Sequence, residues 1–128
     1  MGQPAAKKGD NITATDLHQI QPPGTSPPVS TPHPFSGLID GSLSSNVKIM
    51  GKPAATKNST ATNTPAHQPF GGTFVKPPAN KATILSGSSA VNINGKPAAR
   101  NGDAAKTCND PADLPVGTVV AVGTVFVS

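Results

Sequence analysis

Three histidines and a single cysteine are the residues of this sequence best suited to chemistry: His18, His33, His67 and Cys108. Imidazole nitrogen and thiolate sulfur are preferred zinc ligands, and four such groups complete a tetrahedral shell. No cluster of carboxylates accompanies them in the sequence, which favours zinc over calcium or magnesium. We therefore predict a closed Cys-His₃ structural zinc site, in which four protein ligands leave no position open for a reactive water.

The spacing of these ligands follows a six-residue phrase that the chain repeats. The phrase reads Gly-Lys-Pro-Ala-Ala-Arg at residues 95–100 and recurs in related form at residues 51–56 and 2–7. Counted from the proline of each phrase, 14 residues lead to His18, 14 to His67 and 11 to Cys108. Because equivalent residues of three repeats converge around a pseudo-threefold axis, this spacing favours a metal site. The plainer alternative is that each histidine is an ordinary solvated side chain.

The place of His33 in the repeat stays open. Residues 31–35 resemble residues 64–70, so the repeat mate of His67 is either His18 or His33. The remaining histidine is then the additional ligand. Both assignments put all four residues in the predicted site.

Each inner phrase follows a segment with the alternation of a short strand. β-Branched residues alternate with other side chains at residues 47–50 and 91–94, which is typical of a half-buried strand. An apolar segment and a Gly-Ser turn precede these strands, at residues 38–42 and 84–88. Glycine and proline of the phrase end the strand, because glycine allows a positive φ and proline donates no hydrogen bond to a sheet.

The two ends of the chain hold complementary parts of this repeating unit. The first phrase, at residues 2–7, has no strand before it, whereas residues 118–127 contain both strands and have no phrase after them. We therefore expect a closed pseudo-threefold domain spanning residues 1–128, in which the C-terminal strand 118–127 lies beside the N-terminal phrase.

The composition allows two interpretations. The 128 residues include 13 glycines and 15 prolines, no Trp or Tyr, and a formal net charge of +4. One interpretation is a flexible Pro-rich secreted segment, and the other is a loop-rich β protein held together by a metal. The repeats favour the second. The proline density predicts a long surface loop from Asn11 to Ser36. Elsewhere in the chain we expect a brief strand at 73–75 and a single helical turn near 110–114.

Several function classes find little support in the sequence. No apolar stretch is long enough to span a membrane, and no apolar run follows Lys7 and Lys8 to form a Sec-type signal peptide. The basic residues are dispersed and have no aromatic stacking platform beside them, which argues against nucleic-acid binding. A zinc-dependent hydrolase is the enzymatic alternative, but the chain has no His-Glu-x-x-His motif.

The phrase, the alternating strand before it and the interspersed His and Cys resemble the PAAR-repeat proteins. These proteins form the spike tips of type VI secretion systems and of other contractile injection systems, phage tails included. The resemblance implies an all-β, cone-shaped domain with pseudo-threefold repeats, little helix and a zinc ion near its apex. His18, His33, His67 and Cys108 match the three histidines and one cysteine that bind this zinc. Lys7 and Thr56 depart from the arginine that ends the third phrase.

The resemblance also implies a function without catalysis. We expect a monomeric structural protein whose base caps a trimeric spike protein, either VgrG-like or a phage central spike, and whose tip pierces the target envelope. Membrane contact would be transient, and no nucleic acid would be bound. Separate effector proteins could attach, whereas we expect no fused toxin domain. The protein would be made in the cytoplasm, assembled at the tip of the apparatus and expelled to the target cell or outside.

Overall fold

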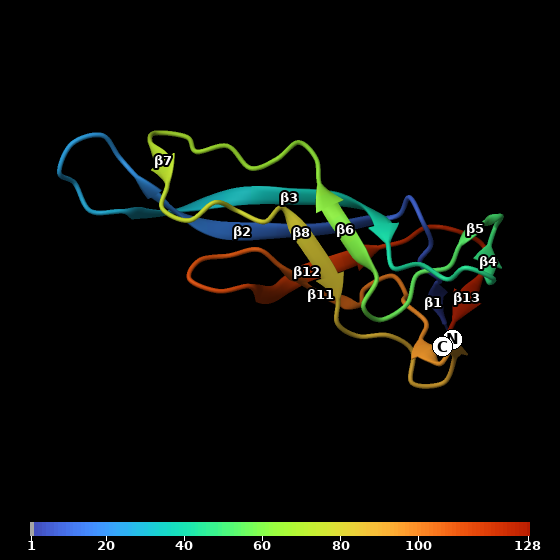
Figure 1. The fold of residues 1–128 in the computed structure, drawn as a ribbon. Helices are drawn as coiled ribbons and strands as arrows, with labels where there is room; N and C mark the ends of the chain where they lie inside the picture. Colours follow the sequence, from blue (N-terminus) through green and yellow to red (C-terminus); the bar gives the residue numbers. More distant parts are fainter. Residues whose placement is uncertain (1) are drawn as a thin grey trace.

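The computed structural model describes residues 2–128, and all the regular secondary structure in this range is β-strand (Figure 1). The larger sheet contains β2 (Asn11–Gln21), β3 (Val29–Gly41), β6 (Thr60–Asn63), β7 (Thr73–Phe74), β8 (Lys81–Ile84), β11 (Ala104–Thr107) and β12 (Leu114–Val120). Three two-stranded pairs are formed by β1 (Gln3–Pro4) with β13 (Phe126–Val127), β4 (Lys48–Ile49) with β5 (Lys52–Pro53), and β9 (Asn92–Ile93) with β10 (Lys96–Pro97). The prediction of an all-β fold is therefore confirmed. Residues 2–128 contain no helix that could cross a membrane. The helical turn predicted near 110–114 is not formed, so this prediction is wrong.

The larger sheet closes on itself. Its strand order is β12-β11-β8-β6-β3-β2-β7, and β12 pairs in addition with β2 through Thr118 opposite Thr13. Short β7 is added beyond this closure, where Phe74 pairs with Ile20 near the end of β2. Figure 1 shows the long β2–β3 hairpin extending away from the three small strand pairs, which gather near the termini at the opposite end. We call the end with the three pairs the base.

The three strand pairs of the base are equivalent parts of the repeat. In β4–β5 and β9–β10, two residues with positive φ join the strands: Met50 and Gly51 at 52° and 81°, and Asn94 and Gly95 at 53° and 80°. Positive φ at both central positions is typical of the hairpin turn that fits the twist of a sheet. In the third pair, Gln3 lies opposite Val127, so the two chain ends lie side by side.

A ring of three hydrogen bonds joins the phrases at their second alanine. Ala6 donates to the Ala99 carbonyl (2.9 Å), Ala99 to the Ala55 carbonyl (3.1 Å), and Ala55 to the Ala6 carbonyl (3.0 Å). All three alanines are buried. Because the backbones meet at the pseudo-threefold axis, a larger side chain there would enter space that neighbouring chain already fills. The double alanine of the phrase is thus explained by this close approach.

Each phrase ends in a turn whose first residue is paired with the residue three positions later. The main-chain nitrogens of Lys7, Thr56 and Arg100 donate to side-chain oxygens of Asp10 (3.0 Å), Ser59 (2.9 Å) and Asp103 (2.7 Å), respectively. The side chains of Lys7 and Arg100 also form ion pairs with these aspartates. In the first and third phrases a basic residue is therefore paired with an aspartate, whereas Thr56 is paired with the hydroxyl of Ser59. The two departures from arginine noted in the sequence keep the local hydrogen bond.

The prediction of a long loop from Asn11 to Ser36 is wrong. Most of this segment forms β2 and the first part of β3, which pair in register from Asn11 opposite Leu38 to Ile20 opposite Val29. Strand β3 pairs with β6 only from Gly37 onward, so its proline-containing part lies at an edge. Proline is tolerated there because its missing N–H group is not needed on the open side. Inward and outward residues alternate along β3.

Candidate metal centre

The inner face of β2 carries an aspartate and a histidine into the interior. Asp16, His18 and Ile20 alternate with more exposed neighbours and are all buried, because successive side chains of a strand point to opposite faces. His67 belongs to the connection between β6 and β7, and Cys108 directly follows β11. Three separate parts of the chain therefore converge at this point.

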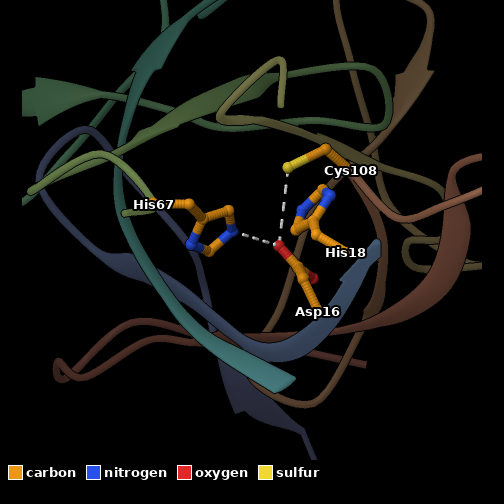
Figure 2. Close-up of side chains that lie close together, drawn as sticks. All are labelled: Asp16, His18, His67 and Cys108. Carbon is orange, nitrogen blue, oxygen red and sulfur yellow. Dashed lines mark hydrogen bonds and ion pairs between the residues drawn. The ribbon is translucent and has the colours of Figure 1, made fainter. Parts of the chain in front are cut away.

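Four potential ligands form a compact buried group. One donor atom each from Asp16, His18, His67 and Cys108 lies within 4.8 Å of the others. Figure 2 shows the four side chains pointing toward one another inside the strands. We refer to this set as the Asp16 cluster. It combines a carboxylate, two imidazoles and a thiol.

Asp16 is the centre of the hydrogen bonds in this cluster. Its Oδ2 atom accepts from His67 Nε2 at 2.8 Å and from the Cys108 thiol at 3.5 Å, and both contacts are drawn in Figure 2. Its Oδ1 atom accepts from the Thr107 hydroxyl at 2.5 Å and from Asn109 Nδ2 at 3.4 Å. Loss of the thiol proton, together with a shift of the His67 ring proton from Nε2 to Nδ1, would leave a carboxylate, a neutral imidazole nitrogen and a thiolate, which is the donor set that zinc requires.

The tautomer of His67 follows from its neighbours. Asn63 Nδ2 lies 3.2 Å from His67 Nδ1 and can only donate, so Nδ1 accepts and the proton of a neutral ring is on Nε2. The same Asn63 amide donates to Asn80 Oδ1 at 3.0 Å, and Asn80 in turn accepts from the His67 main-chain nitrogen at 2.9 Å. These bonds orient the ring toward Asp16.

His18 is the strongest single sign of an additional ligand. The side chain is 1% exposed, yet neither of its ring nitrogens has a hydrogen-bond partner among the described residues. A buried polar group without a partner costs about 1–3 kcal/mol and calls for an explanation. Burial is the main cause that lowers the pKa of His18. The Asp110 carboxylate, whose Oδ2 atom lies 3.5 Å from His18 Nδ1, opposes this shift. A neutral ring has the free lone pair that a metal ion needs.

The Cys108 thiol is poorly suited to ionise without a cation. Burial, as the first cause, raises the pKa of this thiol to about 11, and the neighbouring Asp16 carboxylate adds to the rise. A nearby divalent ion has the opposite effect, because it stabilises the thiolate directly. The residues of the Asp16 cluster therefore fit a metal ion of the zinc type in donor chemistry, in burial and in the unsatisfied nitrogens of His18.

His33 lies next to the cluster but outside the group of four. Its ring centre is 5.5 Å from that of His18 and 5.3 Å from that of His67, and the side chain is buried. Its Nδ1 atom lies 2.9 Å from the Thr31 carbonyl oxygen, and its Nε2 atom lies 3.0 Å from the Gln68 carbonyl oxygen. Of the four ligands predicted from the sequence, the structure brings three within 4.8 Å of one another and places the fourth beside them.

Sequence reasoning did not select Asp16 as a ligand. The available signal was its position two residues before His18, which puts both side chains on one face of a strand. This signal was lost because the segment was interpreted as a loop. The supporting residues Thr107 and Asn109, which flank Cys108, were also missed, because their roles depend on the end of β11 lying close to Asp16 of β2.

Two cavities adjoin the centre. One, of about 240 Å³, reaches His33 and His67 and is lined largely by apolar atoms of Pro34, Pro65 and Phe70. The other, of about 50 Å³, reaches His18 and Cys108 beside Asp110.

A family model described as the PAAR motif matches residues 30–111, about two thirds of the chain. The matched range contains the two inner phrases at 51–56 and 95–100, together with His33, His67 and Cys108. His18 and Asp16 precede it. A search of curated proteins finds no similar sequence.

Proposed function

Because this chain belongs to the PAAR-motif family, we propose that it is the tip of the spike in a contractile injection machine, either a type VI secretion system or a phage-tail-like particle. Its base would cap a trimeric spike protein, and its far end would pierce the target envelope when the machine contracts. The observation that carries this proposal is the pseudo-threefold base, in a chain whose repeated phrase matches the family.

The base has the symmetry that a three-chain partner needs. Three equivalent strand pairs surround the ring of Ala6, Ala55 and Ala99, so a single chain presents a similar edge to each of three identical subunits. Exposed apolar side chains lie on or beside these pairs, namely Met50, Val91, Val122, Val125 and Phe126. Their burial against a partner would contribute favourable free energy, which supports the base as the docking surface.

The metal would act as a structural staple, and we propose that it is zinc. The Asp16 cluster connects β2 with the His67 connection and with the start of the β11–β12 connection. A structural zinc ion can add on the order of 10 kcal/mol to the folding of a small domain. In this chain it would fix connections that have few apolar side chains to hold them.

A structural role needs no reaction at the metal. Four protein donors complete a tetrahedral shell and leave no position for an attacking water, which supports a non-catalytic centre over a hydrolase. The protein would be made in the cytoplasm, assembled on the spike and expelled with it, and separate effectors could travel attached to the tip. No observation favours a second function.

The test is binding to the blunt end of a trimeric spike. Purified protein would be mixed with the β-helical end of a spike from the same genome, and native mass spectrometry would give the stoichiometry. We expect one chain per three spike subunits. Phe126→Asp at the base, where the side chain is 60% exposed, is expected to abolish binding, and Val29→Asp at the far end serves as the control. Equal binding of both variants, or no complex with the unaltered protein, would contradict the proposal.

A further inference from the structure

The positive charge of this protein is concentrated at the base. Together with the three phrases, the turns that follow them and the adjoining end of β3, the base holds seven of the ten basic residues and three of the six aspartates. This end therefore carries the whole net charge of +4, and the rest of the chain is neutral. The basic residues at this end are Lys7, Lys8, Lys48, Lys52, Lys57, Lys96 and Arg100. A charge gathered at one end of a molecule acts on the partner that approaches this end.

Five of these basic residues have no counter-charge in the protein. Asp10 and Asp103 form ion pairs with Lys7 and Arg100, so Asp40 is the one other aspartate at this end. The remaining lysines are exposed and form no ion pair among residues 2–128. We call them the base lysines: Lys8, Lys48, Lys52, Lys57 and Lys96.

Strand pairing brings two base lysines into one row. Pro53 of β5 lies opposite Lys48 of β4, and its carbonyl accepts from the Lys8 main-chain nitrogen at 2.9 Å on the other side. Because residues directly opposite each other on adjacent strands are neighbours, Lys8 and Lys48 flank Pro53. The corresponding rows of the other two repeats are Lys57, Pro97 and Asn92, and Asn101, Pro4 and Phe126. Equivalent positions of the base therefore hold two lysines, one lysine and an exposed phenylalanine.

The base lysines adjoin the apolar side chains of the proposed docking surface. Exposed Met50 lies in the turn between Lys48 and Lys52. Its sulfur lies 3.5 Å from the main-chain nitrogen of Thr124, next to exposed Val125. Charged and apolar side chains thus form one continuous region. A nucleic acid would leave the apolar part uncovered, whereas a protein surface with an apolar centre and a polar rim covers both parts.

We propose that the end of the spike on which the base docks is acidic, with Asp or Glu side chains that meet the base lysines. This inference rests on the proposed function and goes beyond it, because it names the chemistry of the partner's surface. Complementary charges around an apolar contact mainly raise the rate of association and disfavour wrong partners. Because the three spike subunits are identical, each carries the same acidic groups, although the three rows of the base meet them with unequal numbers of lysines.

The first experiment measures association with the β-helical end of a spike from the same genome at increasing salt. The association rate constant is expected to fall at least about tenfold between about 50 and about 500 mM NaCl, while the dissociation rate constant changes less than about threefold. An association rate that does not depend on salt would overturn this inference and leave the proposed function intact. Absence of any complex with the unaltered protein would contradict the proposed function, and this inference with it.

Charge reversal shows whether the base lysines cause the effect. The double variant Lys8→Glu, Lys48→Glu is expected to lower the association rate constant at low salt by about tenfold or more. The matched control is Lys76→Glu, Lys106→Glu, which makes the same change in net charge at exposed lysines outside the base and should have less than about a threefold effect. Equal losses in the two double variants would overturn the inference.

Cross-linking of the complex locates the contacts directly. A carbodiimide joins an amine to a carboxylate only where the two groups touch, and mass spectrometry of the digested complex identifies the joined residues. We expect base lysines joined to Asp or Glu of the spike, with Lys76, Lys81 and Lys106 as internal controls that are not joined. A complex without cross-links from the base lysines would overturn the inference. A short DNA duplex or phosphatidylserine vesicles that bind as tightly as the spike would also overturn it, because the base would then attract any polyanion.

Discussion

At the residue scale, the interior of this protein holds groups that are costly to bury unless they share a partner. Asp16 is a completely buried carboxylate, Cys108 is a buried thiol, and His18 has no hydrogen-bond partner among the described residues. A metal ion would explain their convergence within 4.8 Å, because it would satisfy the His18 nitrogen and compensate the charges of Asp16 and the thiolate.

Replacement of Cys108 by serine is expected to weaken zinc binding and thermal stability together. The hydroxyl is a poor zinc ligand, so the variant should contain little metal, while the unaltered protein should contain about one zinc ion per chain. Mass spectrometry of metal content and thermal unfolding would be measured on the same untagged samples. If the zinc-free and the zinc-loaded protein unfold at the same temperature, the ion does not stabilise the fold, and its proposed structural role is contradicted.

The Cys108 thiol of the folded, metal-free protein is expected to react slowly with alkylating reagents. The thiolate is the reactive form, and burial raises the pKa of Cys108 to about 11. At pH 8 this lowers the thiolate fraction about a hundredfold relative to a thiol with a pKa near 9, and the reaction rate should keep rising with pH up to about 11. Rates measured between pH 7 and 10 test this, with urea-unfolded protein as the control. A rate that levels off near pH 9 in the folded protein would show that burial does not raise this pKa.

At the scale of elements, the phrase is the device that joins the three repeats. The hydrogen-bond ring of Ala6, Ala55 and Ala99 has a counterpart that runs in the opposite direction around the axis: directly after each phrase, Lys8, Lys57 and Asn101 donate to the carbonyls of Pro53, Pro97 and Pro4. Each repeat therefore donates to both of its neighbours and accepts from both. Such cyclic pairing satisfies main-chain groups at the axis without a long sheet.

Enlargement of the alanine ring is expected to destabilise the fold. In Ala55→Leu, a larger side chain would be forced against the other two phrases, which should cost about 1–3 kcal/mol or more in the free energy of unfolding. Ala90→Leu, at an exposed position before β9, is the control and should lie within about 0.5 kcal/mol of the unaltered protein. Denaturant unfolding of both variants measures the difference. If Ala55→Leu and Ala90→Leu have the same free energy of unfolding, the space around the pseudo-threefold axis can accommodate a larger side chain, and the proposed close packing is contradicted.

At the scale of the whole molecule, two different arrangements occupy the two ends. The base is nearly threefold, with three strand pairs and a small apolar cluster that includes Ala5, Ala54 and Ala98. The other end is asymmetric, because one hairpin, β2–β3, is much longer than its counterparts and carries Asp16, His18 and His33. The threefold symmetry is thus found at the proposed docking surface, and it is lost where the candidate metal centre lies.

Circular permutation is expected to leave the fold intact. Because Gln3 pairs with Val127 as Lys96 pairs with Ile93, the chain ends occupy the place of a hairpin turn. A short Asn-Gly linker between the ends, with new termini opened between Asn94 and Gly95, should therefore give a folded protein with unchanged zinc content. Circular dichroism, thermal unfolding and metal analysis test this. A permuted chain opened within β2, at Thr15, is the control and should not fold.

The sequence by itself determined the class of the fold, the repeat and three members of the Asp16 cluster. These features depend on local information: alternation of side chains specifies a strand, glycine and proline specify where it ends, and a repeated phrase implies repeated structure. The ligand type of His18, His67 and Cys108 is likewise a property of each residue. The fold class was therefore predictable, and so was the family.

Only the tertiary structure decided which groups meet. The prolines at 32 and 34 indicated a loop, but they lie in a strand because β3 has an open edge at that point, and an edge is defined by other strands. Asp16 became a candidate ligand, and His33 a neighbour, because β2, the connection after β6 and the end of β11 converge. The physical reason is that burial and coordination depend on distances between residues far apart in the chain, whereas residue type and spacing fix only local conformation.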